Sequence, residues 1–166
     1  MINKINIALI GASGVVGRKI ISLLEKRNLN IDNFYPLGFS SVGNKIVFKN
    51  QNLLIEDAAD FDCTKAHLII LSAGSEVARK YANKFVSKGV YVVDLSSEFR
   101  YEENIPLIIP EINGSILNNI KKPSLIFKIF PKINPNIIAN IAVDIGLFSY
   151  PNSSIPIILF TACDSE

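Results

Sequence analysis

The sequence is poor in the residues that metal and thiol chemistry need. It contains one histidine and two cysteines in 166 residues. Cys63 and Cys163 lie far apart, and neither stands in a metal-spaced cluster or a disulfide framework. The histidine, His67, opens the apolar run 68–71, where a place at the start of a strand is favoured over a catalytic role. We therefore predict no metal site and two reduced thiols.

Charge and hydrophobic length argue against two further classes of partner. The net charge is only +2 and the lysines are scattered, so the clustered basic surface of a nucleic-acid-binding protein is absent. Hydrophobic residues make up 49% of the chain, but no uninterrupted run approaches the roughly 20 residues of a membrane span. The run 5–10 is too short for a secretory signal and leads into a glycine turn. We expect a cytoplasmic protein that binds neither nucleic acid nor membrane.

Strand and helix patterns alternate along the first two-thirds of the chain. Short apolar runs predict buried parallel strands at 4–10, 34–39, 68–71, 90–94 and 125–130. Helical spacing predicts crossover helices at 15–27 and 76–88, with a hairpin at 45–49 and 53–55. Short loops between alternating strands and helices favour an α/β fold of the Rossmann type, a doubly wound parallel sheet.

The pattern is looser beyond Ser96. Pro106 and Pro110 punctuate an extended stretch, and Ile116 and Leu117 are expected on a short helix. The remaining segments are predicted as a loop at 131–136, a buried helix at 137–148 and a strand at 155–161. We therefore divide the chain into a dinucleotide-binding domain, 1–133, and the beginning of a second domain, 134–166.

A glycine-rich turn links the first predicted strand to the first predicted helix. Backbone N–H groups at a helix N-terminus hold a pyrophosphate if the backbone can approach closely, and glycine permits that approach. Gly11 would form the turn, Gly14 would leave room for the phosphates, and Gly17 would let the helix pack on the sheet. The spacing is G-x-x-G-x-x-G, and its place between strand and helix favours nucleotide binding over a merely structural turn.

The residues after the second predicted strand bear on the choice of nucleotide. NAD sites usually carry an acidic residue there, which accepts hydrogen bonds from the ribose hydroxyls. This chain has Phe39 followed by Ser40 and Ser41, so a 2′-phosphate should be tolerated, although no arginine stands beside the serines. NADP is therefore predicted, with NAD as the alternative; a plain surface loop is the other interpretation.

Three further segments carry a family resemblance. They are Ser-Ala-Gly at 72–74, Asp-Leu-Ser-Ser-Glu-Phe-Arg at 94–100 and Ile-Pro-Glu-Ile-Asn at 109–113. With the glycine turn, they resemble the aspartate-semialdehyde dehydrogenase family, in order along essentially the whole chain. The related N-acetyl-glutamyl-phosphate reductases fit the 96–100 segment less well.

The resemblance implies an oxidoreductase of amino-acid biosynthesis. Members of the family reduce aspartyl phosphate to aspartate semialdehyde with NADPH through a cysteine thioester, on the route to lysine, threonine and methionine. It implies that Arg100 binds the substrate phosphate, where the residues alone would equally allow pairing with Glu102 or Glu103. The cofactor-binding residues are then Gly11, Ser13, Gly14, Val15, Val16, Gly17, Ser40, Ser41, Ser72, Ala73 and Gly74.

The sequence departs from the family at the nucleophile. The tripeptide at 134–136 precedes the catalytic cysteine in the family, but here the next residue is Ile137. Isoleucine has no lone pair and forms no thioester, and nothing marks Cys163 as a substitute. Leu95 also replaces the asparagine common in the family, and the family's substrate domain continues beyond the strand matched by 155–161. No catalytic residue is therefore assigned.

Three interpretations follow for function. The leading one is a truncated, NAD(P)-binding relative without independent catalysis. The second is a dinucleotide-binding regulatory module completed by a partner chain, and the third is an active dehydrogenase with a different nucleophile. The apolar segments 137–148 and 155–160 would normally pack on a substrate domain, so we also expect self-association through exposed apolar surface.

Overall fold

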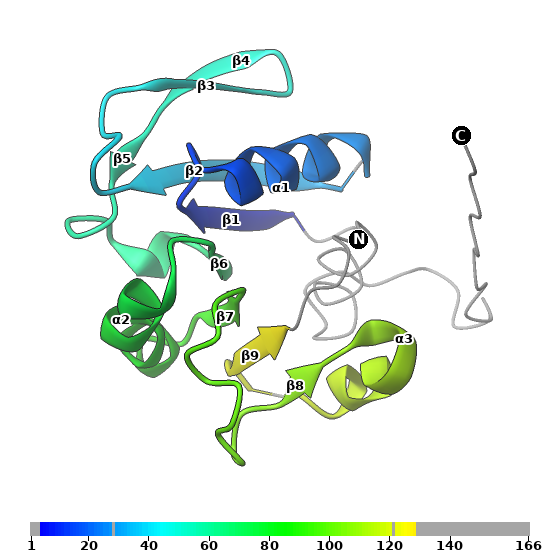
Figure 1. The fold of residues 1–166 in the computed structure, drawn as a ribbon. Coiled ribbons are helices and arrows are strands. Elements are labelled where there is room, and N and C mark those ends of the chain that lie inside the picture. The colour runs from blue at the N-terminus through cyan, green and yellow to red at the C-terminus, as the bar shows by residue number, and fades with distance from the viewer. Residues whose placement is uncertain (1–3, 28, 121, 129–166) are drawn as a thin grey trace.

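A seven-stranded sheet forms the centre of the molecule. The computed structural model describes residues 4–27, 29–120 and 122–128. The strands lie in the order β5-β2-β1-β6-β7-β9-β8 and every pairing in this sheet is parallel (Figure 1). They are β1 (Ile5–Ile10), β2 (Ile31–Gly38), β5 (Glu56–Asp57), β6 (Leu68–Leu71), β7 (Tyr91–Asp94), β8 (Leu107–Ile108) and β9 (Leu125–Lys128). The predicted doubly wound parallel sheet is confirmed.

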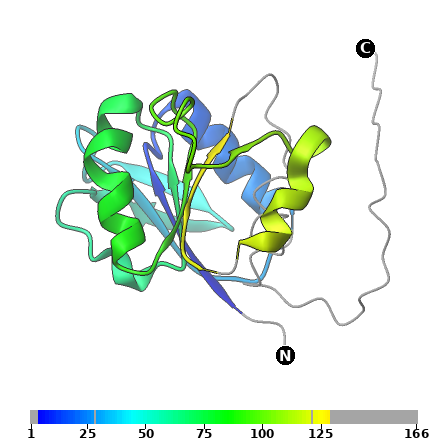
Figure 2. The same ribbon diagram turned by 90° about the horizontal axis from the view of Figure 1, so that it is seen from below.

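Helices cover both faces of this sheet. Figure 2 shows α2 on one face and α1 and α3 on the other. The helices are α1 (Val15–Lys26), α2 (Ser75–Ser87), α3 (Pro110–Asn113) and two short 3₁₀ helices, η1 (Cys63–Lys65) and η2 (Gly114–Asn119). None of the helices in the described residues is long and apolar enough to cross a bilayer.

The two faces of the central strand β1 feed two separate cores. Leu9 belongs to the same buried cluster as Ile20 of α1, whereas Ile10 belongs to the cluster that contains Phe85 of α2. Neither Leu9 nor Ile10 is exposed to solvent. Successive side chains of a strand point to opposite faces, so a strand covered on both sides is apolar on both, as β1 is from Ile7 to Ile10. This explains why β1 shows an apolar run instead of alternation.

A separate antiparallel hairpin lies beside α1. It consists of β3 (Lys45–Phe48) and β4 (Gln51–Leu54), joined through Lys49 and Asn50, which both have positive φ, 47° and 63°. Hairpins with two-residue loops need such left-handed residues, and asparagine accepts this conformation more readily than lysine does. The turn is therefore compact but built without the usual glycine.

Contacts with α1 and β2 compensate for the unusual turn. The Lys49 backbone N–H donates to the Glu25 carboxylate at 2.8 Å, and the Lys49 ammonium donates to the Leu29 carbonyl at 3.0 Å. The Phe48 ring lies 4.4 Å from the Phe34 ring, centroid to centroid. These contacts anchor the hairpin to the main sheet.

Several predicted boundaries need correction. The second strand begins at Ile31, three residues before the predicted start, because pairing with β1 begins there and includes the polar residue Asn33, with a register shift at Asp32. The second hairpin strand is 51–54 instead of 53–55. The extended stretch around Pro106 contains the short strand β8, which pairs with β9, and the predicted helix at Ile116 is the 3₁₀ helix η2.

Other predictions lie outside the described residues. These are the loop 131–136, the helix 137–148, the strand 155–161, Cys163, the boundary after residue 133 and the apolar surface expected to self-associate. Ile137 also falls there, so its position relative to the sheet stays a prediction.

The hairpin supplies a test of packing. Phe48 is 5% exposed and Val47, on the opposite side of β3, is 56% exposed. We expect Phe48→Ala to lower the free energy of unfolding by about 3–5 kcal/mol because it leaves a cavity against Phe34. Val47→Ala should change it by less than about 0.5 kcal/mol. Urea unfolding measures both, and equal losses would contradict the packing described.

Candidate functional site

The loops that follow four parallel strands start at one edge of the sheet. Ile10 is in register with Leu37 and Leu71, and Leu71 is in register with Asp94. The chain runs from β1 to β2 on one side and later to β6 on the other, so the strand order reverses at β1. In open α/β sheets, ligands bind outside the carboxyl ends of the strands at such a reversal.

The glycine turn fills the point of reversal. Gly11 has a φ of +90°, and a Cβ there would lie 2.8 Å from the Ser72 carbonyl oxygen. A Cβ on Gly17 would collide with the Gly11 carbonyl oxygen. The Gly11 N–H donates to the Leu37 carbonyl at 2.9 Å. Both positions therefore require glycine, because the turn lies directly against its neighbours.

The turn leaves the start of α1 accessible. Gly14 is the N-cap and contributes no side-chain hydrogen bond, and Val15 and Val16 are 80% and 37% exposed. Helix N-termini carry N–H groups without helical partners and a partial positive charge, which suits a phosphate. The predicted residues from 11 to 17 thus lie around one helix N-terminus.

The loop after β2 is joined to the glycine turn. The Ser13 hydroxyl donates to the Ser41 hydroxyl at 2.9 Å, while Ser40 is exposed. Gly38 makes room for this arrangement, since a Cβ there would lie 2.5 Å from the Ser41 hydroxyl oxygen. The structure therefore brings together two segments that the sequence places 28 residues apart.

The third predicted segment lies on the other side of the turn. The Ser72 hydroxyl donates to the Ile10 carbonyl at 2.9 Å. Ala73 is half-buried, and Gly74, with a φ of +89°, is the N-cap of α2. The predicted cofactor-binding residues therefore lie in the loops that follow the neighbouring strands β2, β1 and β6.

A buried carboxylate organises the loop after β7. Asp94 is fully buried and accepts the Ser96 N–H at 3.0 Å and the Ser96 hydroxyl at 2.7 Å. Burial raises the pKa of Asp94, and the bonds from Ser96 oppose that shift. The Ser96 hydroxyl in turn accepts the Glu98 N–H at 3.1 Å.

The same loop is clamped to α2. The Arg79 guanidinium donates two hydrogen bonds to the Glu98 carboxylate, at 2.5 and 2.8 Å. The hydroxyls of Ser75 and Ser97 lie 3.3 Å apart. Arg100 is exposed at the end of this loop, two residues beyond Glu98. A two-pronged ion pair restricts orientation as well as distance, so it restrains the backbone that leads to Arg100.

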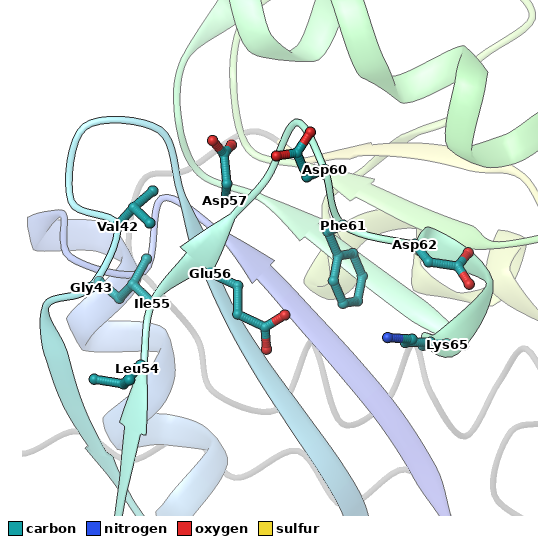
Figure 3. Close-up of a pocket in the computed structure, with 10 residues that line it drawn as sticks. All are labelled: Val42, Gly43, Leu54, Ile55, Glu56, Asp57, Asp60, Phe61, Asp62 and Lys65. Atoms are coloured by element: carbon teal, nitrogen blue, oxygen red, sulfur yellow. The ribbon is translucent and has the colours of Figure 1, made fainter.

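A hollow lies beside the loop after β2 (Figure 3). It has a volume of about 520 Å³. Its lining includes Val42, Gly43, Phe61 and Lys65 and the carboxylates of Glu56, Asp57, Asp60 and Asp62. Four carboxylates against one lysine disfavour an anionic ligand. Asp57 of β5 is in register with Gly38, the last residue of β2. Its carboxylate accepts a hydrogen bond from the Ala59 N–H at 2.8 Å, within its own loop. The lining of this hollow therefore does not suit a phosphate.

Some structural roles were missed from the sequence. The sequence assigned no structural role to Asp94, Arg79 or Glu98. Asp94 and Glu98 nevertheless lie in the segment 94–100, which carries the family resemblance. His67 precedes β6 as predicted, and its Nδ1 accepts the Asn6 N–H at 2.9 Å. Cys63 is a buried free thiol. Within the described ranges, no three His, Cys, Asp or Glu residues are grouped as metal ligands would be.

Comparison with known proteins places this arrangement in a family. Residues 6–120 match the family model described as "Semialdehyde dehydrogenase, NAD binding domain". The chain belongs to the semialdehyde dehydrogenase family. The family resemblance stated from the sequence is therefore confirmed.

Individual relatives agree with the family assignment. The aspartate-semialdehyde dehydrogenase of Legionella pneumophila is 41% identical over 137 residues, which are 82% of this chain and 38% of that protein. The crystal structure of aspartate semialdehyde dehydrogenase II from Vibrio cholerae, complexed with ASA, matches with a TM-score of 0.71 and 30% identity, over 75% of this chain and 41% of that one.

A third relative shares the fold. The crystal structure of the Candida albicans aspartate semialdehyde dehydrogenase with NADP has a TM-score of 0.62 at 21% identity, over 74% of this chain and 42% of that one. This chain thus spans about two-fifths of the length of these relatives.

Asp94 predicts a pH dependence of stability. Its pKa in the folded state lies above the usual 3.8, so between the two values the folded state holds a proton that the unfolded state has released. Stability then falls as pH rises through this window. Asp94→Asn removes the titration, so the variant should gain stability relative to wild type from pH 4 upward, by at most about 1.4 kcal/mol per pH unit.

Urea unfolding of both proteins at several pH values between 4 and 7 measures this difference. Titrating groups far from Asp94, such as Asp62, whose pKa is lowered by its bonds from Thr64, cancel between the two proteins. Parallel profiles for wild type and variant would contradict the effect assigned to Asp94.

Proposed function

We propose that this chain binds NADP at the glycine turn, with the pyrophosphate on the N-terminus of α1. The observation that carries the proposal is the steric requirement for glycine at both Gly11 and Gly17. Gly11 lies against the residue that follows β6, and Gly17 lies against the backbone of Gly11 and Ala12, so the turn is folded tightly onto the start of α1. The N–H groups at the start of α1, from Val15 to Gly17, have no partner within the helix and can donate to the phosphates.

The loop after β2 supports NADP over NAD. Ser40 and Ser41 stand where an NAD site usually has a carboxylate, and hydroxyl groups do not repel a 2′-phosphate. The Ser13–Ser41 hydrogen bond holds this loop beside the turn. The Candida albicans relative, whose structure was solved with NADP, shares the fold. We infer that Ser40 and Ser41 face the 2′-phosphate.

Beyond cofactor binding, the family's reaction needs an anion-binding residue and a nucleophile. Arg100 would hold an acyl phosphate beside the nicotinamide end of the cofactor, on the loop that Arg79 and Glu98 restrain. Ile137 stands in the sequence position of the family's cysteine and supplies no nucleophile. We infer that this chain binds the cofactor but does not form the thioester by itself.

Residues 1–133 would form the cofactor-binding domain and 134–166 would belong to a second domain. No contact among the described residues favours a regulatory module completed by another chain, so we do not propose that function.

A calorimetric titration with NADP and, separately, NAD tests the cofactor proposal. We expect saturable binding, stronger for NADP. Gly17→Ala should weaken it by at least about tenfold, because displacing the turn removes N–H contacts worth about 1.5–3 kcal/mol each to a charged phosphate. Val47→Ala, on the hairpin, is the matched control and should bind as wild type does. Absence of NADP binding by the folded wild-type chain would overturn the proposal.

An activity measurement tests the inference that this chain does not form the thioester by itself. Absorbance at 340 nm should show no oxidation of NADPH by aspartyl phosphate in the presence of the wild-type chain, because Ile137 offers no thiolate. Cys163→Ser is the control for a substitute nucleophile. Turnover by wild type that this variant abolishes would show that Cys163 replaces the family's cysteine, and turnover by both would point to another nucleophile.

A further inference from the structure

A partly exposed aromatic side chain stands at the carboxyl end of β2. Phe39 directly follows β2 and is 40% exposed. Its ring centroid lies 5.6 Å from the ring of Tyr81 on α2. Tyr81 is only 8% exposed and stacks on Phe85 with 5.8 Å between centroids. One side of the Phe39 ring thus packs on the buried Tyr81 ring, and part of its apolar surface stays exposed to solvent.

The neighbouring contacts place this surface along the nucleotide. Ser41, two residues after Phe39, is hydrogen-bonded to Ser13 in the glycine turn. A dinucleotide with its pyrophosphate on that turn has its adenosine ribose at the end of the second strand of the unit. The base is bonded directly to this ribose. In the proposed binding mode the base therefore lies near the carboxyl end of β2, which Phe39 follows.

Other aromatic residues of the described chain are less suitable. Tyr101 is 91% exposed, but it follows β7, which is separated from β2 by β1 and β6. Three strand spacings amount to roughly 14 Å, so Tyr101 belongs to the opposite half of the crevice. The Phe61 ring packs on Tyr35, 5.1 Å away, and lines the acidic hollow.

We propose that Phe39, supported by Tyr81, is the platform on which the adenine ring of the bound dinucleotide stacks. The proposal rests on the proposed binding of NADP and adds a residue that none of the predicted contacts includes. Stacking on an aromatic ring uses the π-face of a base and ignores its hydrogen-bonding edge. Phe39 would therefore supply affinity for every adenine nucleotide, whereas Ser40 and Ser41 would discriminate between NADP and NAD.

The first test compares ligands by calorimetry. Phe39→Ala should weaken NADP, NAD and 2′,5′-ADP by the same factor, roughly 5- to 150-fold for the loss of one stacked base. Nicotinamide mononucleotide, which lacks adenine, should bind both proteins equally. Phe39→Tyr should restore most of the affinity, and Phe39→Leu, which still covers Tyr81 but has no π-face, should not. Thermal unfolding of each variant confirms that it is folded.

The second test uses the absence of tryptophan from the chain. Phe39→Trp introduces a single tryptophan at the proposed platform, and its fluorescence should be quenched saturably by 2′,5′-ADP. Val47→Trp, on the exposed side of β3, is the matched control and should show no saturable quenching.

The outcomes separate this inference from the proposed function. A folded wild-type chain that binds no adenine nucleotide would overturn both. Wild-type binding of NADP with unchanged affinity in Phe39→Ala would overturn the stacking platform alone. Binding of 2′,5′-ADP to Phe39→Trp without quenching would also overturn it, and selective loss of NADP with NAD unaffected would assign Phe39 to the 2′-phosphate loop instead.

Discussion

The close approach of backbone to backbone at the β1–β6 junction is the constraint on which the site depends. Gly11 lies against the carbonyl of Ser72, and Gly17 lies against the carbonyl of Gly11. These contacts place the end of one strand, the start of a helix and the end of the next strand within a few ångströms of each other. A methyl group at either glycine would force them apart and displace the N-terminus of α1.

The loops around this junction are held by polar contacts of two kinds. The Ser13–Ser41 hydrogen bond joins two loops that face the proposed adenosine half, and such a bond between hydroxyls leaves both oxygens able to accept further partners. The Arg79–Glu98 pair and the buried Asp94 fix the loop on the opposite side. The two halves of the crevice are therefore stabilised independently.

The family assignment and the chemistry of the individual positions lead to different conclusions about the same chain. The glycine turn, the serine loop and the segment ending at Arg100 carry residues of the kinds that we propose for cofactor and anion binding. Position 137 holds isoleucine and not the cysteine that covalent catalysis needs. Binding and bond formation are separable because backbone N–H groups and a helix dipole hold a nucleotide, whereas a thioester requires one specific sulfur atom.

The sequence by itself determined the parallel α/β fold, the position of the glycine turn and the family, because strands buried on both faces and glycines at a strand–helix junction leave patterns within short segments. Its assignment of Ser40, Ser41 and Ser72 to the cofactor site stays a prediction. Only the tertiary structure decided that Ser13 bonds to Ser41, that Arg79 pairs with Glu98 and that Phe39 rests on Tyr81. These partners lie 19 to 42 residues apart in the sequence. Their meeting follows from the strand order and register, which no local pattern encodes.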